Sequence, residues 1–172
     1  MLRNKLMPTV VLSAICIIAV ALLSAVNLIT EPAIIENQEK RTNAALLEVM
    51  PDGGSFEKIN GVDGLPDAVD AVYKSSDGKG YVFRLNAMGY KSGLVIMCGI
   101  DTDGKITGTK CIQSSETNGA EGKLSPMYVG KTEGDYSSVE IISGSTLTSK
   151  GYKNAMKSAF DAFEILTGGD GE

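Results

Sequence analysis

The residues best suited to chemistry form a hydroxyl-rich turn at positions 143–149, with the sequence Ser-Gly-Ser-Thr-Leu-Thr-Ser. Residues 139–142, Val-Glu-Ile-Ile, predict a short, half-buried strand before the turn, and an amphipathic helix is predicted after it. Such a turn presents unpaired backbone amides at the positive end of the helix dipole, where a phosphate binds favourably. The hydroxyl groups therefore either cap the helix, with Thr148 or Ser149 as the N-cap residue, or cover a bound phosphate.

The elements that must position this turn are a C-terminal helix and a sheet. The apolar residues of the helix recur at helical spacing and predict one buried face: Tyr152, Ala155, Met156, Ala159, Phe160, Phe163 and Leu166. Strands are predicted at 71–75, 81–87, 94–100 and 105–112, after an irregular entry over 56–68. Since short turns join these strands, we expect an antiparallel sheet with the C-terminal helix packed on one face, an α+β fold.

A second stretch of interest is the polar, glycine-rich segment 115–123, Ser-Glu-Thr-Asn-Gly-Ala-Glu-Gly-Lys. It is predicted to be a loop that leaves the last strand of the sheet. By itself it is typical of an ordinary surface loop, although loops also carry many functional residues.

The N-terminus carries a candidate membrane anchor. Residues 8–29 are uncharged, and as a helix they would extend about 33 Å, enough to cross a hydrocarbon core of about 30 Å. Arg3 and Lys5 precede this run and Glu31 follows it, which places the N-terminus in the cytoplasm by the positive-inside tendency. A cleaved signal peptide is the competing interpretation, but the apolar run is long for one and no small-x-small cleavage site follows it cleanly.

These patterns divide the chain into three parts. Residues 1–31 form a cytoplasmic N-terminus and a single transmembrane helix, and residues 32–52 form a juxtamembrane amphipathic helix that ends at Pro51. Residues 53–172 form an extracytoplasmic domain. The middle helix is either a solvated stalk or a surface that holds the domain against its neighbours.

Composition excludes several classes of function. The net charge is −5, and the residues after position 30 comprise 14 basic against 21 acidic ones, which argues against a nucleic-acid partner. The chain has no histidine, which removes histidine-based catalysis and most transition-metal sites, so no metal site and no catalytic side chain are expected. Cys98 and Cys111 are not spaced as cluster ligands, and they form either two buried free thiols or a disulfide.

The turn at Ser143-Gly144-Ser145-Thr146 resembles the flavinylation motif Asp-x-x-(Ser/Thr)-Gly-Ala-Thr of the FMN-binding domains in Rnf and Na⁺-translocating NADH:quinone reductase complexes. Glu140 stands where that family has Asp, and Ser145 stands where it usually has Ala.

Two further stretches are similar to the same family. Four residues match its Glu-Thr-Pro-Gly-Leu-Gly loop: Glu116, Thr117, Gly119 and, one position later than in the motif, Gly122. Asn118 here replaces Pro, and Ala120 replaces Leu. The predicted strands and turns over 89–106 are similar to the stretch just upstream. Two motifs in the right order and an N-terminal anchor make the resemblance specific, and the length suits the Rnf G subunit.

The resemblance implies that Thr146 carries covalent FMN through a phosphoester bond, and that the 116–122 loop packs against the isoalloxazine ring. The cofactor-binding residues expected on this basis are Glu116, Thr117, Gly119, Ser143, Gly144, Ser145, Thr146, Leu147, Thr148 and Lys150. The helix N-terminus expected at Thr148–Lys150 would neutralise the phosphodiester, with Lys150 either a second cation or a plain solvated lysine.

The function that the resemblance implies is electron transfer in an ion-translocating ferredoxin:NAD⁺ oxidoreductase of the cell membrane. Its expected partners are the other membrane and iron–sulfur subunits of that complex, and a flavin transferase that attaches the FMN. Two alternatives stay open: a membrane-anchored flavoprotein reductase outside any such complex, and a non-redox surface binding module whose hydroxyl turn only caps a helix.

Overall fold

The computed structural model of this chain describes residues 2–116 and 119–168, without the side chains of residues 2–9, 33 and 35. Helix α1 (Leu2–Val49) is continuous and stops just before Pro51, as expected of a residue that cannot continue a helix. From Val10 onward, the helix is long and apolar enough to cross a membrane. The chain divides into two compact units, of which the second begins at Arg41 and contains everything described below.

The second unit is built around a five-stranded antiparallel meander in which each strand pairs with the next along the chain. The strands are β1 (Phe56–Ile59), β2 (Val69–Ser75), β3 (Gly80–Ala87), β4 (Leu94–Asp101) and β5 (Ile106–Gln113). The α+β fold and the four strands β2–β5 predicted from the sequence are confirmed. The irregular entry predicted over 56–68 is wrong at its start, because β1 pairs there with the free edge of β2.

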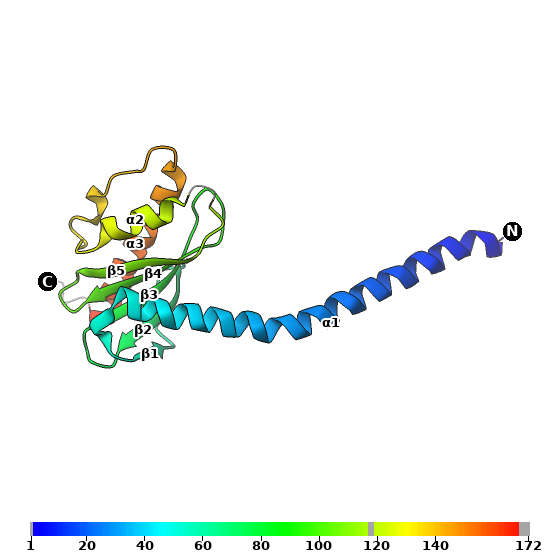
Figure 1. Ribbon diagram of the computed structural model, residues 1–172, viewed down its shortest axis with the longest axis horizontal. Coiled ribbons are helices and arrows are strands. Elements are labelled where there is room, and N and C mark those ends of the chain that lie inside the picture. Colours follow the sequence, from blue (N-terminus) through cyan, green and yellow to red (C-terminus); the bar gives the residue numbers. More distant parts are fainter. Residues whose placement is uncertain (1, 117–118, 169–172) are drawn as a thin grey trace. The chain divides into compact units, whose positions relative to one another are not determined.

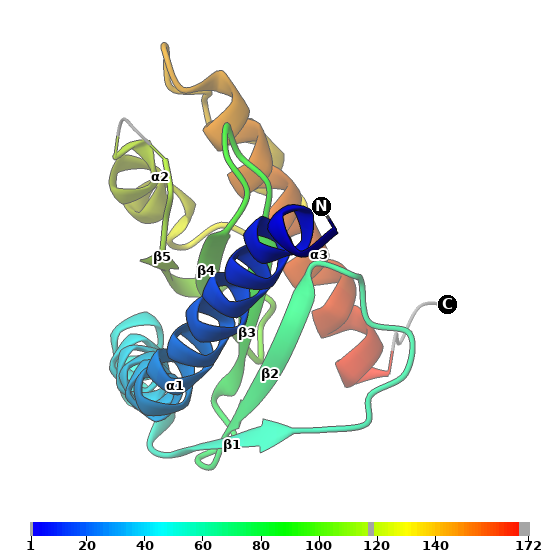
Figure 2. The ribbon, with the colours of Figure 1, turned by 90° about the vertical axis from the view of Figure 1, so that its right-hand side faces the viewer.

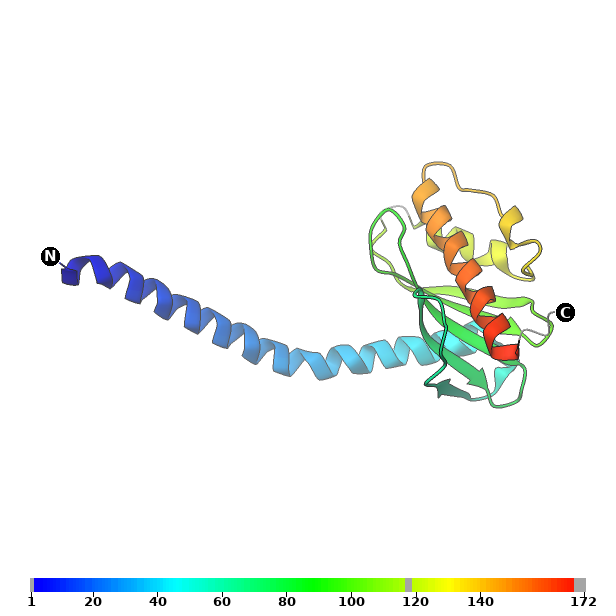
Figure 3. The same ribbon diagram turned by 180° about the vertical axis from the view of Figure 1, so that it is seen from behind.

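Helices cover both faces of the sheet (Figures 1 and 3). On one face, α3 (Thr146–Thr167) and α2 (Ala120–Tyr128) bury the larger core, which includes alternate residues of β4 such as Ile96, Cys98 and Ile100. On the other face, the last turns of α1 bury a smaller core with Val82 and Met97. The central strand β4 is therefore apolar on both sides, as its unbroken apolar run predicted.

The end of α1 belongs to the fold of the sheet domain. The carbonyl oxygen of Val49 accepts a hydrogen bond of 2.6 Å from the Thr107 hydroxyl. A Cβ atom on Gly108 would lie 2.7 Å from the same oxygen, and one on Gly99 would lie 2.9 Å from it. The two glycines let the backbone of α1 approach the sheet more closely than side chains would allow.

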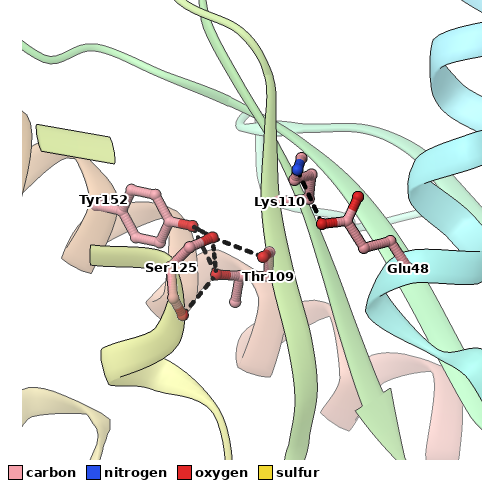
Figure 4. A network of polar contacts seen from close by, with 5 residues as sticks. All are labelled: Glu48, Thr109, Lys110, Ser125 and Tyr152. Atoms are coloured by element: carbon pink, nitrogen blue, oxygen red, sulfur yellow. Dashed lines mark hydrogen bonds and ion pairs between the residues drawn. The ribbon is translucent and has the colours of Figure 1, made fainter. Parts of the chain in front are cut away.

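A hydroxyl network fastens β5 to both helices of the opposite face (Figure 4). The Thr109 and Tyr152 hydroxyls are hydrogen-bonded at 2.6 Å, and the Ser125 hydroxyl donates to the Thr109 carbonyl oxygen at 2.6 Å. Burial raises the pKa of Tyr152, so its hydroxyl stays protonated and available to this network. On the other side of β5, Lys110 pairs with Glu48 of α1 at 2.8 Å.

Helix α2 begins inside the segment predicted to be a polar loop, so that prediction is wrong from Ala120 onward. The helix runs beside β5 (Figure 2) and buries Leu124 and Tyr128 in the larger core. The Tyr128 ring stacks on Tyr152 of α3 with a centroid separation of 5.3 Å. This burial, rather than local propensity, accounts for a helix in a sequence rich in glycine.

The cysteines of the sheet domain are free thiols. Of the two alternatives left open by the sequence, the structure shows free thiols; Cys98 is buried and Cys111 is half-buried. Burial raises the pKa of the Cys111 thiol to about 11, so the thiol is protonated at neutral pH. Among the residues that the structure describes, no three potential metal ligands come together.

The close contact at Gly108 makes a prediction about stability. We expect Gly108→Ala to lower the free energy of unfolding by about 1–3 kcal/mol, because its Cβ would meet the Val49 backbone and overpack the interface. The matched control is Gly122→Ala in α2, where a Cβ meets nothing within 4 Å and should stabilise the helix by about 0.5–1 kcal/mol. Urea unfolding of the detergent-solubilised chain measures both. Equal effects of the two substitutions would contradict the importance of the close contact.

Candidate functional site

Helix α3 begins two residues earlier than predicted, at Thr146 instead of Thr148. Gly144 turns the chain with a φ of +79°, Ser145 occupies the N-cap position, and Thr146 is the first helical residue. The first helical hydrogen bond runs from the Ser149 amide to the Ser145 carbonyl oxygen, at 2.9 Å. The prediction that Thr148 or Ser149 caps the helix, and that the helix begins at Thr148–Lys150, is therefore wrong.

The strand predicted over 139–142 is also wrong. These residues follow a short 3-10 helix, η2 (Tyr136–Ser138), and bury Val139 against the larger core without joining the sheet. At the nearby β5 edge, residues 130 and 131 already hydrogen-bond to Ile106, and α2 lies beside the strand (Figure 2).

The hydroxyls of the turn differ in accessibility. Thr148 and Ser149 are only 4% and 2% exposed, and Ser145 is 9% exposed. The Ser149 hydroxyl donates to the Ser145 carbonyl oxygen at 3.0 Å and accepts from the Ile142 amide at 3.1 Å. Thr146 and Ser143 are exposed, so they are the turn's hydroxyls that an external reagent can reach.

Glu116 joins the turn to two loops of the sheet. Its carboxylate accepts hydrogen bonds from the Lys91 amide at 2.9 Å, from the Tyr90 amide at 3.2 Å and from the Thr148 hydroxyl. Partial burial raises the pKa of this carboxyl, but these hydrogen bonds and the nearby Lys91 charge together lower it below its usual value. Glu116 is therefore ionised at neutral pH.

Two glycines bring the 88–91 loop into backbone contact with α3. A Cβ on Gly151 would lie 2.3 Å from the Met88 carbonyl oxygen. A Cβ on Gly89 would lie 2.6 Å from a Glu116 carboxylate oxygen and 3.2 Å from the Thr148 Cα. The first turn of α3, the 88–91 loop and the segment after β5 are thereby held together.

These three segments enclose a cavity of about 470 Å³. Most of the predicted cofactor-binding residues line it: Glu116, Gly144, Ser145, Thr146, Leu147 and Thr148. The first turn of α3 lines the cavity. The amides of residues 146–148 have no earlier helical carbonyl to donate to, and Ser145 makes no side-chain cap bond. An anion on Thr146 would therefore meet backbone donors and the positive end of the helix dipole.

Other predicted site residues lie elsewhere. Gly119 borders a separate groove of about 660 Å³ along β5 and α2. Ser143 and Lys150 are exposed, and neither lines the 470 Å³ cavity. The prediction for Thr117 lies outside the described residues.

The cavity also contains Tyr90 and Ala120, which the sequence does not single out as site residues. Ala120 is 3% exposed and lies on the buried side of α2. A prediction of a helix from residue 120 could have identified it. Tyr90 belongs to the stretch 89–106 that is similar to the family, but this similarity gives it no role. Its position in the cavity depends on the backbone contacts around Gly89, for which the sequence holds no signal.

The ionised state of Glu116 predicts how stability depends on pH. Because the pKa of this group is lowered in the folded state, its contribution is fully present above the ordinary carboxyl value of about 4.3 and is lost as pH falls through the folded-state pKa. We expect Glu116→Gln to lower the free energy of unfolding at neutral pH, and the difference from the unsubstituted chain to shrink in acid. Urea unfolding at neutral pH and in acid measures this difference in free energy. Glu57→Gln, at an exposed position, is the control. If the difference in the free energy of unfolding stayed the same in acid, the charge of Glu116 would make no contribution to stability.

Comparison with known proteins finds similarity over the region of this site. Residues 89–161, from the 88–91 loop through most of α3, match the FMN-binding domain. The chain is 29% identical to the G subunit of an ion-translocating oxidoreductase complex of Methanosarcina acetivorans, over 88% of this chain and 89% of the relative. It is 27% identical to the G subunit of the Na⁺-translocating ferredoxin:NAD⁺ oxidoreductase complex of Acetobacterium woodii, over 91% of the chain and 90% of the relative.

A further relative comes from a complex named as proton-translocating. The G subunit of the proton-translocating ferredoxin:NAD⁺ oxidoreductase complex of Clostridium ljungdahlii is 23% identical, over 92% of this chain and 91% of its own. Each of the three matches covers about nine tenths of this chain. The chain is thus similar over most of its length to G subunits of ion-translocating oxidoreductase complexes, and its residues 89–161 match the FMN-binding domain.

Proposed function

We propose that this protein is the FMN-carrying electron-transfer subunit of an ion-translocating ferredoxin:NAD⁺ oxidoreductase complex in the cell membrane, with FMN bonded covalently to Thr146. The observation that carries the proposal is the position of Thr146. It is an exposed hydroxyl at the start of α3, and it lines a cavity built by both motifs of the family resemblance.

The residues of the cavity fit FMN. Its volume of about 470 Å³ falls within the range of small-molecule sites, about 300–1,000 Å³. The phosphate would lie on Thr146 against the amides of the first turn of α3, where Gly144 leaves open space because a Cβ there would meet nothing within 4 Å. Leu147, which is 54% exposed, and Tyr90, which is 68% exposed, offer apolar surface to the ring system.

The exposure of Thr146 and the burial of its neighbours support it as the attachment residue. Attachment forms a phosphorus–oxygen bond to the Thr146 Oγ1 while the bond between the flavin donor's phosphorus and its leaving group breaks. The leaving group and the hydroxyl proton depart, so the chain gains FMN less one water. Thr148 and Ser149 are buried and hydrogen-bonded, and modification of either would require α3 to unfold locally. Thr is stiff about χ1, which limits the orientations of the phosphate.

Bound FMN supplies the redox chemistry, and the chain supplies position and electrostatics. Glu116 keeps a negative charge on the wall of the cavity, which disfavours added electrons on a nearby flavin. The helix dipole of α3 neutralises the phosphodiester. No side chain is required to transfer a proton.

The topology and maturation follow from the same proposal. Residues 1–31 comprise a cytoplasmic N-terminus and one membrane span, residues 32–52 connect it to the domain, and residues 53–172 carry the FMN outside the cytoplasm. A separate flavin transferase attaches the FMN. The partners are the neighbouring redox subunits of the complex, since the relatives are named as subunits of such complexes.

The attachment is tested by intact mass spectrometry of the denatured protein, purified from cells that contain a flavin transferase. We expect the unsubstituted chain to gain the mass of FMN less water, and Thr146→Ala to lose that gain completely. Ser143→Ala, which removes the other exposed hydroxyl of the turn, is the matched control and should keep the gain. An FMN mass that persists in Thr146→Ala would move the attachment to another residue.

The topology is tested by labelling with a membrane-impermeant maleimide. We expect Glu133→Cys, at an exposed position of the domain, to be labelled in intact cells whose outer barriers have been removed. Asn4→Cys should be labelled only after the membrane is permeabilised, and the unsubstituted chain reports the background of its native cysteines. The reverse pattern would place the FMN-binding domain in the cytoplasm.

A further inference from the structure

We infer that Tyr90 is the aromatic wall of the cavity, against which the isoalloxazine ring of the bound flavin lies, with Leu147 contributing aliphatic surface. The inference rests on the proposed function, since it requires FMN on Thr146. It adds a ring-contacting residue outside the two motifs that the family resemblance singled out.

Tyr90 is unusual among the tyrosines of this chain. Its side chain is 68% exposed, whereas Tyr128 and Tyr152 are fully buried and the remaining tyrosines are half-buried. A tyrosine ring brings a large apolar area, which is normally covered in a folded domain. Tyr90 instead has an exposed side chain and lines a cavity that Thr146 also lines.

The backbone of Tyr90 is held in place. Its amide donates to Glu116 at 3.2 Å, and the next amide, of Lys91, donates to the other oxygen of the same carboxylate at 2.9 Å. On its other side, Gly89 packs so closely against Glu116 and Thr148 that no Cβ fits. The position of Tyr90 relative to α3 is therefore set before any ligand binds, which lowers the entropic cost of contact with a flavin.

The other residues of the cavity suit a flat aromatic ring. Leu147 follows the carrier residue Thr146 directly, in the first turn of α3. Ala120 and Gly144 have small or absent side chains, which leave room for a ring between larger neighbours. Aromatic rings favour offset or edge-to-face contacts with one another, and a tyrosine offers either to a flavin.

The first test compares tyrosine nitration in FMN-loaded protein and in Thr146→Ala, both as full-length chains in detergent, with loading checked by intact mass. Peptide mapping gives the rate at each tyrosine. We expect nitration of Tyr90 to be severalfold slower in the loaded protein. Half-buried Tyr73 and Tyr136, which lie outside the cavity, should react at the same rate in both.

The second test uses flavin fluorescence, because a tyrosine in contact with a flavin quenches its emission. We expect Tyr90→Leu to raise the emission per bound FMN severalfold relative to the unsubstituted chain. Met88→Leu, at a 75% exposed position on the same loop but outside the cavity, should leave the emission unchanged. The emission of each sample after denaturation gives its amount of bound FMN, and the emission of the folded sample is divided by it.

The outcomes separate this inference from the function it rests on. Absence of an FMN mass gain in the unsubstituted chain would overturn the proposed function. With FMN attached, equal nitration of Tyr90 in loaded and unloaded protein would overturn the role of Tyr90 alone, and so would unchanged emission in Tyr90→Leu. If Tyr90→Leu fails to fold or to load, the nitration result decides, because it requires no substitution at Tyr90.

Discussion

The carboxylate of Glu116 connects the parts of the cavity that are far apart in sequence. One oxygen accepts from the Lys91 amide, and the other accepts from the Tyr90 amide and the Thr148 hydroxyl. Through this one group, a loop between β3 and β4, the segment after β5 and the first turn of α3 share a fixed geometry. A neutral side chain of similar shape would keep part of this geometry but would lose the charge that strengthens the hydrogen bonds.

Close backbone contacts at glycines support that arrangement, and the same device recurs on the opposite face of the sheet. Gly89 and Gly151 let the 88–91 loop lie directly on α3, while Gly99 and Gly108 let the end of α1 lie directly on β4 and β5. Backbone contacts on both faces of the sheet domain are thus so close that an added methyl group would not fit. The hydroxyl network of Thr109, Ser125 and Tyr152 adds a third connection, between β5 and the two helices of the site's own face.

Local signals in the sequence were sufficient for β2–β5 and for the apolar face of α3, because alternation, turn residues and helical spacing all act within a few residues. They were insufficient where partners decided the outcome. The segment 139–142 has a strand-like pattern but does not join the sheet, whereas β1 gains its strand from pairing with β2. Helix α2 contains Gly122 and Pro126, and it depends on burying Leu124 and Tyr128. For the site, the motif residues of α3 and Glu116 were predicted together, but Tyr90 required knowledge of the backbone contacts around Gly89.

The position of Thr146 as the first residue of α3 has a thermodynamic consequence for a covalent cofactor. A dissociable ligand stabilises its protein by an amount that grows with the logarithm of its free concentration above Kd, and the benefit vanishes on dilution. A phosphodiester on Thr146 would instead be present at a fixed effective concentration beside the amides of the helix start. The interaction with the helix dipole would then become a permanent part of the folded state, independent of how much flavin surrounds the protein. Loading with the cofactor would therefore act, for this domain, as a final step of folding.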